Sequence, residues 1–271
     1  MDAINLNCTS YFEIKNKENN KEYIVVGEKG LYHFNNSPFD YTYLDDYIKS
    51  EISYKNAIKI NDNFIILTSN RIYSNGKDKL VIYDTKKKEI VKEIDGSFVG
   101  GVNGLMLIDI EENKKIIVCG CKKYIPGQNN GILTINLEIR NDNIEIISEK
   151  FNDTENFEVN CFCQINKEDN NNKNIYFFVG GFENERGEGI IQIYRLINNG
   201  DIYKIQYLQE IDIVNKDFEI LEGTINCIIQ SKKNGKIFVN CLDGKIYRFS
   251  KPNINYYLQE EEEDIAKILN L

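Results

Sequence analysis

Hydrophobic residues occur along this chain in short runs of strand length, separated by polar segments rich in Asn, Gly and charged residues. Residues 176–180 and 189–196, for example, are apolar runs on either side of a charged segment. Runs rich in aromatic and β-branched residues and bounded by turn-forming residues are typical of β-strands. Many of these runs are apolar at consecutive positions, which predicts strands that are buried on both faces of a sheet.

The same unit of runs recurs five times, starting near residues 6, 55, 102, 159 and 225. Each unit begins with an asparagine followed by a small residue; these asparagines are Asn7, Asn56, Asn103, Asn160 and Asn226. A second and a third apolar run follow each time, and a more polar fourth run follows most of them. A four-stranded unit repeated about every 40–50 residues is typical of a β-propeller blade. We therefore expect an all-β, most simply five-bladed, β-propeller over residues 1–258.

The expected strands can be placed within the units. The second strands are 23–27, 64–68, 116–120, 176–180 and 237–241. The third strands are 30–34, 79–84, 131–137, 189–196 and 244–249. Fourth strands are expected at 89–94, 144–148 and 203–211, and residues 41–48 form either an outer strand or a short helix.

The third strands resemble the WD40-like propeller superfamily. Asp243-Gly244-Lys245-Ile246-Tyr247-Arg248-Phe249 looks like the end of a WD repeat, and Tyr83-Asp84 stands where that family has Trp-Asp. The resemblance implies a propeller that binds a protein or peptide. The chain has no tryptophan and no Gly-His dipeptide, so it lacks the usual buried polar network of the family.

Five units allow two arrangements, a closed ring of five blades or an open set that another chain completes. We favour the closed ring. Beyond the repeats, residues 259–271 predict a short helix because acidic residues crowd its first turn. Ile265, Ile268 and Leu269 share one face of this helix and could dock on the propeller; the alternative is a solvated tail.

Net charge narrows the classes of partner. The formal charge is −9 and the isoelectric point about 4.9, which argues against nucleic acid and anionic membranes as partners. No run is long enough for a transmembrane helix. The first residues show no basic and apolar signal sequence, so we expect a cytoplasmic protein.

The seven cysteines are interpreted as free, reduced and mostly buried thiols. Three of them follow the repeated asparagine and are expected to be small filler residues: Cys8, Cys161 and Cys227. Cys119 and Cys121 could in principle meet Cys161 and Cys163 across neighbouring units. Because Cys-x-Cys is not the usual zinc spacing, we expect no metal site.

Motifs for catalysis and for cofactors are absent from the sequence. It contains no glycine-rich phosphate loop and no Gly-x-Ser-x-Gly elbow, and the single histidine, His33, lies within an apolar run and is expected to be packed. We expect no cofactor and, as the leading hypothesis, a non-enzymatic interaction scaffold. The alternative is a glycosidase-type or lactonase-type hydrolase with carboxylates at the channel mouth. Its candidate residues are Glu28, Glu183, Glu188 and Asp243.

A partner site is predicted on the loops between second and third strands of units two to four, at 70–78, 122–130 and 182–188. These loops are longer than their equivalents in the other two units, and aromatic and Arg side chains are common interface anchors. The predicted anchors are Arg71, Tyr73, Tyr124, Phe182 and Arg186. The alternative is that the loops are tolerated surface insertions.

The five repeated asparagines should line the central channel. Each amide could bond the backbone of a neighbouring blade. Alternatively, the amides could form a ring that binds water, a cation or a small polar ligand.

Overall fold

The structure is a computed structural model of the 271-residue chain. It describes residues 8–15, 18, 20–27, 30–34, 46–48, 54–69, 80–94, 101–123, 129–140, 142–165, 175–200, 202–211, 223–231, 236–242, 244 and 246–249. These residues form nineteen strands in five antiparallel sheets. The described residues contain no helix, and hence none that could cross a membrane.

Each sheet is one blade, and its strands follow chain order from one edge to the other. Blade 1 contains β1 (Cys8–Lys15), β2 (Lys21–Gly27), β3 (Gly30–Phe34) and β4 (Asp46–Ile48). Blade 2 contains β5 (Tyr54–Lys59), β6 (Phe64–Ser69), β7 (Leu80–Asp84) and β8 (Glu89–Ile94). Blade 3 contains β9 (Val102–Asp109), β10 (Lys114–Cys121), β11 (Asn130–Arg140) and β12 (Asn143–Glu155). Blade 4 contains β13 (Phe157–Gln164), β14 (Ile175–Glu183), β15 (Glu188–Asn199) and β16 (Ile202–Ile211). Blade 5 has three described strands, β17 (Ile225–Gln230), β18 (Ile237–Cys241) and β19 (Ile246–Phe249).

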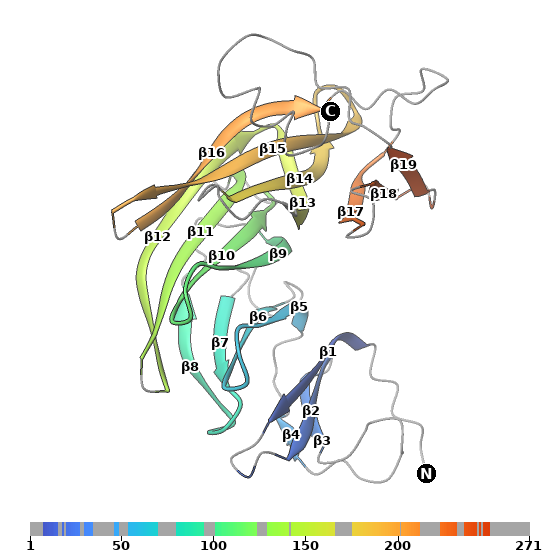
Figure 1. Ribbon diagram of the computed structural model, residues 1–271. Coiled ribbons are helices and arrows are strands. Elements are labelled where there is room, and N and C mark those ends of the chain that lie inside the picture. Colours follow the sequence, from blue (N-terminus) through green and yellow to red (C-terminus); the bar gives the residue numbers. More distant parts are fainter. Residues whose placement is uncertain are drawn as a thin grey trace.

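The blades are arranged around an axis in chain order (Figure 1). The first strand of each blade contacts the first strand of the next blade, so β1 contacts β5, β5 contacts β9, β9 contacts β13, and β13 contacts β17. The first strands are therefore the innermost ones and line the axis. This arrangement confirms the predicted β-propeller of five blades.

Hydrophobic cores between the blades explain why the strands are apolar on both faces. In β6, Ile65 and Leu67 pack towards blade 1, whereas Phe64 and Ile66 between them pack towards blade 3. All four side chains are almost fully buried. Side chains two residues apart share a face of a strand, so odd-numbered and even-numbered positions face opposite sides of the sheet. A middle strand that is covered on both sides therefore needs apolar residues at both sets of positions. Equivalent cores join blade 3 to blade 4 and blade 4 to blade 5.

Four cores thus join the five blades in series. In the described part of the chain, no fifth hydrophobic core joins blade 5 to blade 1. Among the described residues, the predicted ring is thus not closed by a hydrophobic core between these two blades, and the face of blade 5 that points away from blade 4 carries no such core. The predicted C-terminal helix, residues 259–271, lies outside the described residues.

Several predicted strand boundaries agree with the structure and others need correction. The third strand of blade 1 and the fourth strand of blade 2 match their predictions residue for residue. Strand β12 is longer than predicted because it pairs along the whole of β11. Residues 46–48 form strand β4, which favours the strand interpretation of this segment over the helix. In blade 4 the predicted loop 182–188 is a four-residue turn, 184–187, because β14 and β15 extend into it.

Candidate functional site at the propeller axis

Every innermost strand carries a β-bulge at the same place, near its start. In β9, Val102 pairs with Cys121 and Gly104 pairs with Gly120, which leaves Asn103 as the extra residue. The same register shift leaves one extra residue in the first strand of each blade. These extra residues are Thr9, Lys55, Asn103, Asn160 and Asn226. A bulge leaves its extra residue unpaired and re-aims the side chain, so these five positions form one set around the axis.

The bulges correct the sequence alignment of the asparagines in two blades. Asn103, Asn160 and Asn226 occupy the bulge, but in blade 2 the bulged residue is Lys55 and Asn56 is the next, paired residue. In blade 1 the bulged residue is Thr9, and the predicted Asn7 lies outside the described residues. The sequence could not separate the two registers in blade 2, because Lys55 and Asn56 are adjacent polar residues before a small one.

A chain of hydrogen bonds links three of the bulged residues from blade to blade. The Lys55 Nζ atom donates to Asn103 Oδ1 at 2.7 Å, and Asn103 Nδ2 donates to Asn160 Oδ1 at 2.9 Å. An ammonium group can only donate, so the atom of Asn103 that it contacts must be the oxygen. This fixes the orientation of the Asn103 amide and then that of the Asn160 amide. Asn160 Nδ2 is left as the last group in this series of hydrogen bonds. That nitrogen is buried and has no hydrogen-bond partner among the described residues.

Asn56 has the first of the two roles considered for the asparagines, since its amide bonds the backbone of a neighbouring blade. Its Nδ2 atom donates to the backbone oxygens of Val102 at 3.3 Å and Asn103 at 3.0 Å, and so ties blade 2 to blade 3. Its backbone N–H donates to Thr68 Oγ1 at 3.0 Å within blade 2. The amide nitrogen of Asn56 is thus engaged with the backbone of the neighbouring blade.

Close approach of the inner strands explains the small residue after the bulge. A Cβ atom on Gly104 would lie 2.6 Å from the backbone oxygen of Asn160. A contact this short cannot be relieved by moving a side chain, because the obstructing atom belongs to the backbone of β13. Glycine at this position therefore allows β9 and β13 to meet at the axis.

Only two of the five predicted anchor residues, Phe182 and Arg186, lie in the described part of the chain; Arg71, Tyr73 and Tyr124 do not. Phe182 is half-buried within β14 rather than exposed in a loop. Arg186 lies in the following turn, and its NH1 atom contacts Glu210 at 2.5 Å and Glu188 at 3.6 Å. The hydrogen bond to Glu210 raises the pKa of Arg186. Its charge is therefore matched by carboxylates of its own blade.

The candidate carboxylates of the hydrolase alternative do not come together from several blades in the described residues. Glu183 and Glu188 pair directly across β14 and β15, so both belong to one hairpin of blade 4. Glu28 and Asp243 lie outside the described residues. Within the described chain, no group of three or more His, Cys, Asp or Glu side chains is arranged to hold a metal ion.

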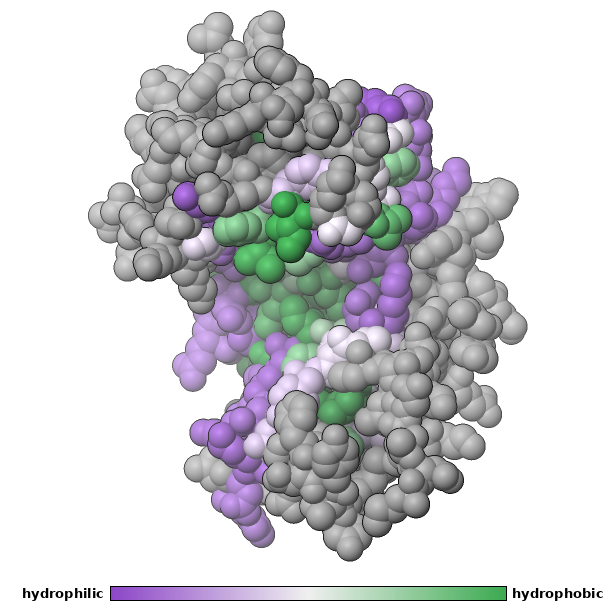
Figure 2. Space-filling model, turned by 90° about the vertical axis from the view of Figure 1, so that its right-hand side faces the viewer, coloured by the Kyte–Doolittle hydropathy of each residue, from purple (hydrophilic) through white to green (hydrophobic). Residues whose placement is uncertain are grey.

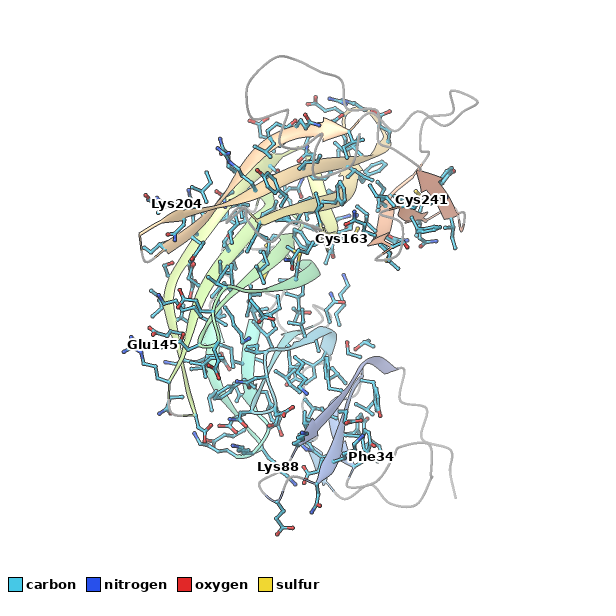
Figure 3. All side chains as sticks on the ribbon, viewed as in Figure 1. Phe34, Lys88, Glu145, Cys163, Lys204 and Cys241 are labelled. Carbon is cyan, nitrogen blue, oxygen red and sulfur yellow. The ribbon has the colours of Figure 1, made fainter. Side chains whose placement is uncertain are left out.

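The cysteines considered as a possible quartet face opposite sides of their blades. Cys119 and Cys121 belong to the core between blades 2 and 3, and burial raises the pKa of Cys121 to about 12. Cys161 and Cys163 pack on the core between blades 4 and 5, which includes Cys241 of the facing blade. Figure 3 labels Cys163 and Cys241 on these two blades. None of the six described cysteines forms a disulfide, and three of them are buried. The predicted filler residue Cys227 is instead exposed.

His33 is a packed residue, as predicted. It is buried in blade 1, and its Nε2 atom lies 2.8 Å from the hydroxyl oxygen of Tyr83 in blade 2. This polar contact crosses the core between the two blades. The Asp84 that follows Tyr83 accepts hydrogen bonds from the backbone of Lys86 and Lys87, both at 2.9 Å, and so shapes the turn after β7.

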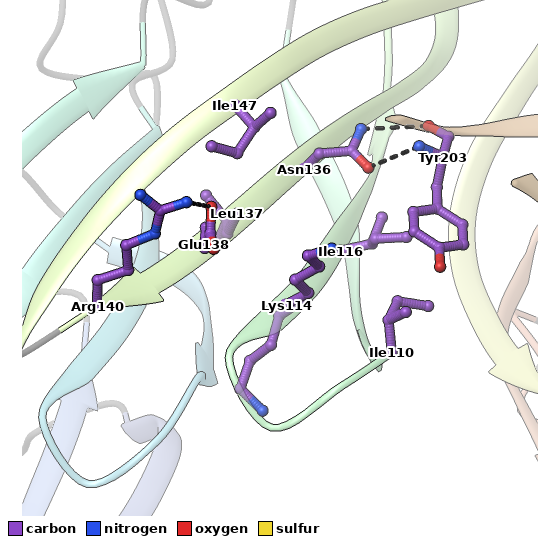
Figure 4. A pocket seen from close by; sticks show the side chains of 10 residues that line it. Ile110, Lys114, Ile116, Asn136, Leu137, Glu138, Arg140, Ile147 and Tyr203 are labelled. Carbon is purple, nitrogen blue, oxygen red and sulfur yellow. Dashed lines mark hydrogen bonds and ion pairs between the residues drawn. The ribbon is translucent and has the colours of Figure 1, made fainter. Parts of the chain in front are cut away.

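A cavity of about 300 Å³ opens between the outer parts of blades 3 and 4 (Figure 4). Asn136 closes one side of it by pairing with the backbone of Tyr203: Nδ2 donates to the carbonyl at 3.2 Å, and the Tyr203 N–H donates to Oδ1 at 3.0 Å. The cationic side chains of the lining are ion-paired, for example Arg140 with Glu138 at 2.7 Å. We interpret this region as a junction between blades.

Blade 5 exposes hydrophobic residues on the face that points away from blade 4. In β18, Ile237 and Val239 pack towards blade 4, so Phe238 between them points the other way. Cross-strand pairing places Ile229 and Ile246 on the same face as Phe238, and we call these three residues the exposed face of blade 5. Ile229 is 58% exposed and Ile246 is 71% exposed. Seen from the side of blades 1 and 5, the molecule shows hydrophobic surface within a hollow (Figure 2).

Comparison with known proteins identifies no family. No protein-family model matches the chain, and no curated protein matches it in sequence. Among solved structures it is similar to a Penicillium chrysogenum alpha-L-arabinanase complexed with arabinobiose (10% identity, TM-score 0.45, covering 92% of this chain and 79% of that one). It is also similar to the Dos1 propeller (9% identity, TM-score 0.43, covering 88% and 66%) and to the extracellular domains 1–2 of Drosophila Semaphorin 1a (8% identity, TM-score 0.45, covering 89% and 64%). The chain thus spans about two thirds of the latter two. Assignment of the propeller fold rests on the blades of the chain itself.

Proposed function

We propose that this chain is a non-enzymatic interaction scaffold, a divergent WD40-like propeller that binds a partner protein. The observation that carries the proposal is the exposed face of blade 5. Two of its isoleucines are more than half exposed. In the cores between the other blades, the equivalent faces are covered by a neighbouring blade. Grouped exposed apolar residues of this kind typically mark protein–protein contact sites.

The size of the expected effect follows from the buried area. Covering a large aliphatic side chain contributes about 1.5–3 kcal/mol. Ile229 and Ile246 are 58% and 71% exposed, so burying both would contribute about 2–4 kcal/mol. This is up to about half of the binding free energy of a micromolar complex, which is about 8 kcal/mol. A lysine at either position would bring a charge into that contact and oppose binding.

The test is affinity purification of the full chain from its own cells, with the bound proteins identified by mass spectrometry. We expect a specific partner to be retained by the unaltered chain and lost from the double variant Ile229→Lys, Ile246→Lys. The matched control is Ile90→Lys, Ile147→Lys, which adds the same charge at two isoleucines that are each 40% exposed on blades 2 and 3. This control should retain the partner.

A second variant tests the surface predicted from the sequence. Replacing Tyr124, Phe182 and Arg186 together by Ala should leave partner binding largely intact if the exposed face of blade 5 is the anchor. Loss of the partner from this variant alone would move the site to the segments 122–130 and 182–188, where the sequence predicts it. A chain that retains no partner but hydrolyses glycosides or lactones would contradict the scaffold function.

A further inference from the structure

The hydrogen-bond chain at the axis has a direction, and this direction selects the kind of ligand that can bind there. It begins at the Lys55 ammonium group and passes through Asn103 to Asn160. At each step the amide oxygen accepts and the amide nitrogen donates. The group left over is therefore a donor, the Asn160 Nδ2 atom, which is buried and has no hydrogen-bond partner in the described part of the chain.

This direction argues against a cation as the ligand. A hard cation would need amide oxygens as ligands. The oxygens of Asn103 and Asn160 already accept hydrogen bonds from Lys55 and Asn103, respectively. The positive charge of Lys55, which begins this series of hydrogen bonds, would repel a cation. A ligand that accepts hydrogen bonds suits the site instead, and a negative charge on it would be attracted by Lys55.

The side chain of Glu158, the described carboxylate nearest to Asn160 in the sequence of β13, is engaged elsewhere. Glu158 lies two residues before Asn160 on β13, where it forms an ion pair with Lys122. It also accepts a hydrogen bond from Asn184 at 3.3 Å. The next bulged residue around the axis, Asn226 of blade 5, is exposed. Its strand, β17, contacts β13, so Asn160 and the exposed Asn226 lie on neighbouring inner strands.

We propose that the axis holds a carboxylate-binding site in which Asn160 Nδ2 donates to the bound carboxylate and the Lys55–Asn103 pair fixes the orientation of that donor. The carboxylate belongs either to a free organic acid or to an acidic side chain of a polypeptide. This site lies at the axis, apart from the exposed face of blade 5, and does not depend on the scaffold function.

The experiment is a titration of the full chain with acetate at constant ionic strength, followed through the side-chain amide signals of ¹⁵N-labelled protein. We expect saturable shifts of the Asn160 amide signal and an increase of the melting temperature with acetate, because a ligand that binds only the folded state stabilises it. Mg²⁺ at the same concentrations should produce neither effect.

Two variants test the roles of the residues. Asn160→Asp keeps the shape but replaces the donor by a negative charge, and should weaken acetate binding at least tenfold. Lys55→Gln removes the charge and the group that fixes the amide orientations, and should also weaken binding. Asn198→Asp is the matched control: it adds the same charge at an exposed asparagine of blade 4 and should bind acetate like the unaltered chain.

The source of the carboxylate is separated by a second probe, N-acetyl-Gly-Asp-Gly-amide. Tighter binding of this peptide than of acetate would indicate an acidic side chain of a polypeptide, and equal binding would indicate a free acid. An unaltered chain whose Asn160 signal responds to neither probe would overturn the proposal. Equal acetate affinity of the unaltered chain and Asn160→Asp would overturn it as well.

Discussion

At the scale of single residues, buried thiols make the stability of the fold sensitive to high pH. Burial raises the pKa of Cys121 to about 12 and raises that of Cys119 well above its ordinary value. The folded state therefore favours the protonated thiol. The contribution of each buried thiol to the free energy of unfolding is complete below the pKa of the unfolded state, near 9. It is lost as the pH rises towards the pKa of the folded state.

The predicted result is a fall in the free energy of unfolding between pH 7.5 and pH 10, measured by urea denaturation. Each fully buried thiol should contribute about 1.4 kcal/mol to this fall. Cys121→Ala should reduce the fall by about that amount, whereas Cys227→Ala, at an exposed thiol, should retain most of it. The same fall in Cys121→Ala and the unaltered chain would show that this thiol is not buried.

At the scale of elements, the outer strands of blades 3 and 4 are joined by a side chain that pairs with a strand backbone. Asn136 of β11 makes two hydrogen bonds to Tyr203 of β16, and its Nδ2 atom also donates to Ser148 of β12 at 3.0 Å. Asn136 is only 4% exposed. Removing its amide would leave polar backbone groups of β16 without these partners.

Asn136→Ala should therefore lower the free energy of unfolding by about 1–3 kcal/mol. The control is Asn198→Ala, which removes an exposed amide that bonds the hydroxyl of the same tyrosine at 3.3 Å. Exposed substitutions of this kind usually change stability by less than about 0.5 kcal/mol. Urea denaturation of both variants measures the difference, and equally small effects would mean that the junction does not hold the two blades together.

Strand positions could be predicted because a middle strand of a propeller blade must be apolar on both faces. The run 237–241 is one example, since it matches β18 residue for residue. The register of the bulge in blade 2 could not be predicted from the sequence. Lys55 and Asn56 are adjacent and both polar, so the hydrophobic pattern is the same whichever of them occupies the bulge. The length of β12 also escaped prediction, since an edge strand can continue through polar residues such as Glu145 and Glu149 as long as its partner continues.

At the scale of the whole molecule, five blades joined in series have two terminal blades with different surroundings. Blades 2, 3 and 4 are packed on both faces, while the described part of blade 5 has a core on one face only. The site proposed at the axis and the contact surface proposed on blade 5 both depend on this order of blades and on the first strand being innermost.

Hydrogen exchange of the full chain, followed by mass spectrometry at the resolution of single strands, tests this arrangement most directly. Strands β6, β10 and β14 lie between two neighbouring strands and are largely buried, so their amides should exchange slowest. The outer strands β8 and β12 should exchange at least about 100-fold faster, because edge strands open locally at lower free energy. Equally slow exchange in β12 and β10, or uniformly fast exchange throughout, would contradict the assigned order of strands in the propeller.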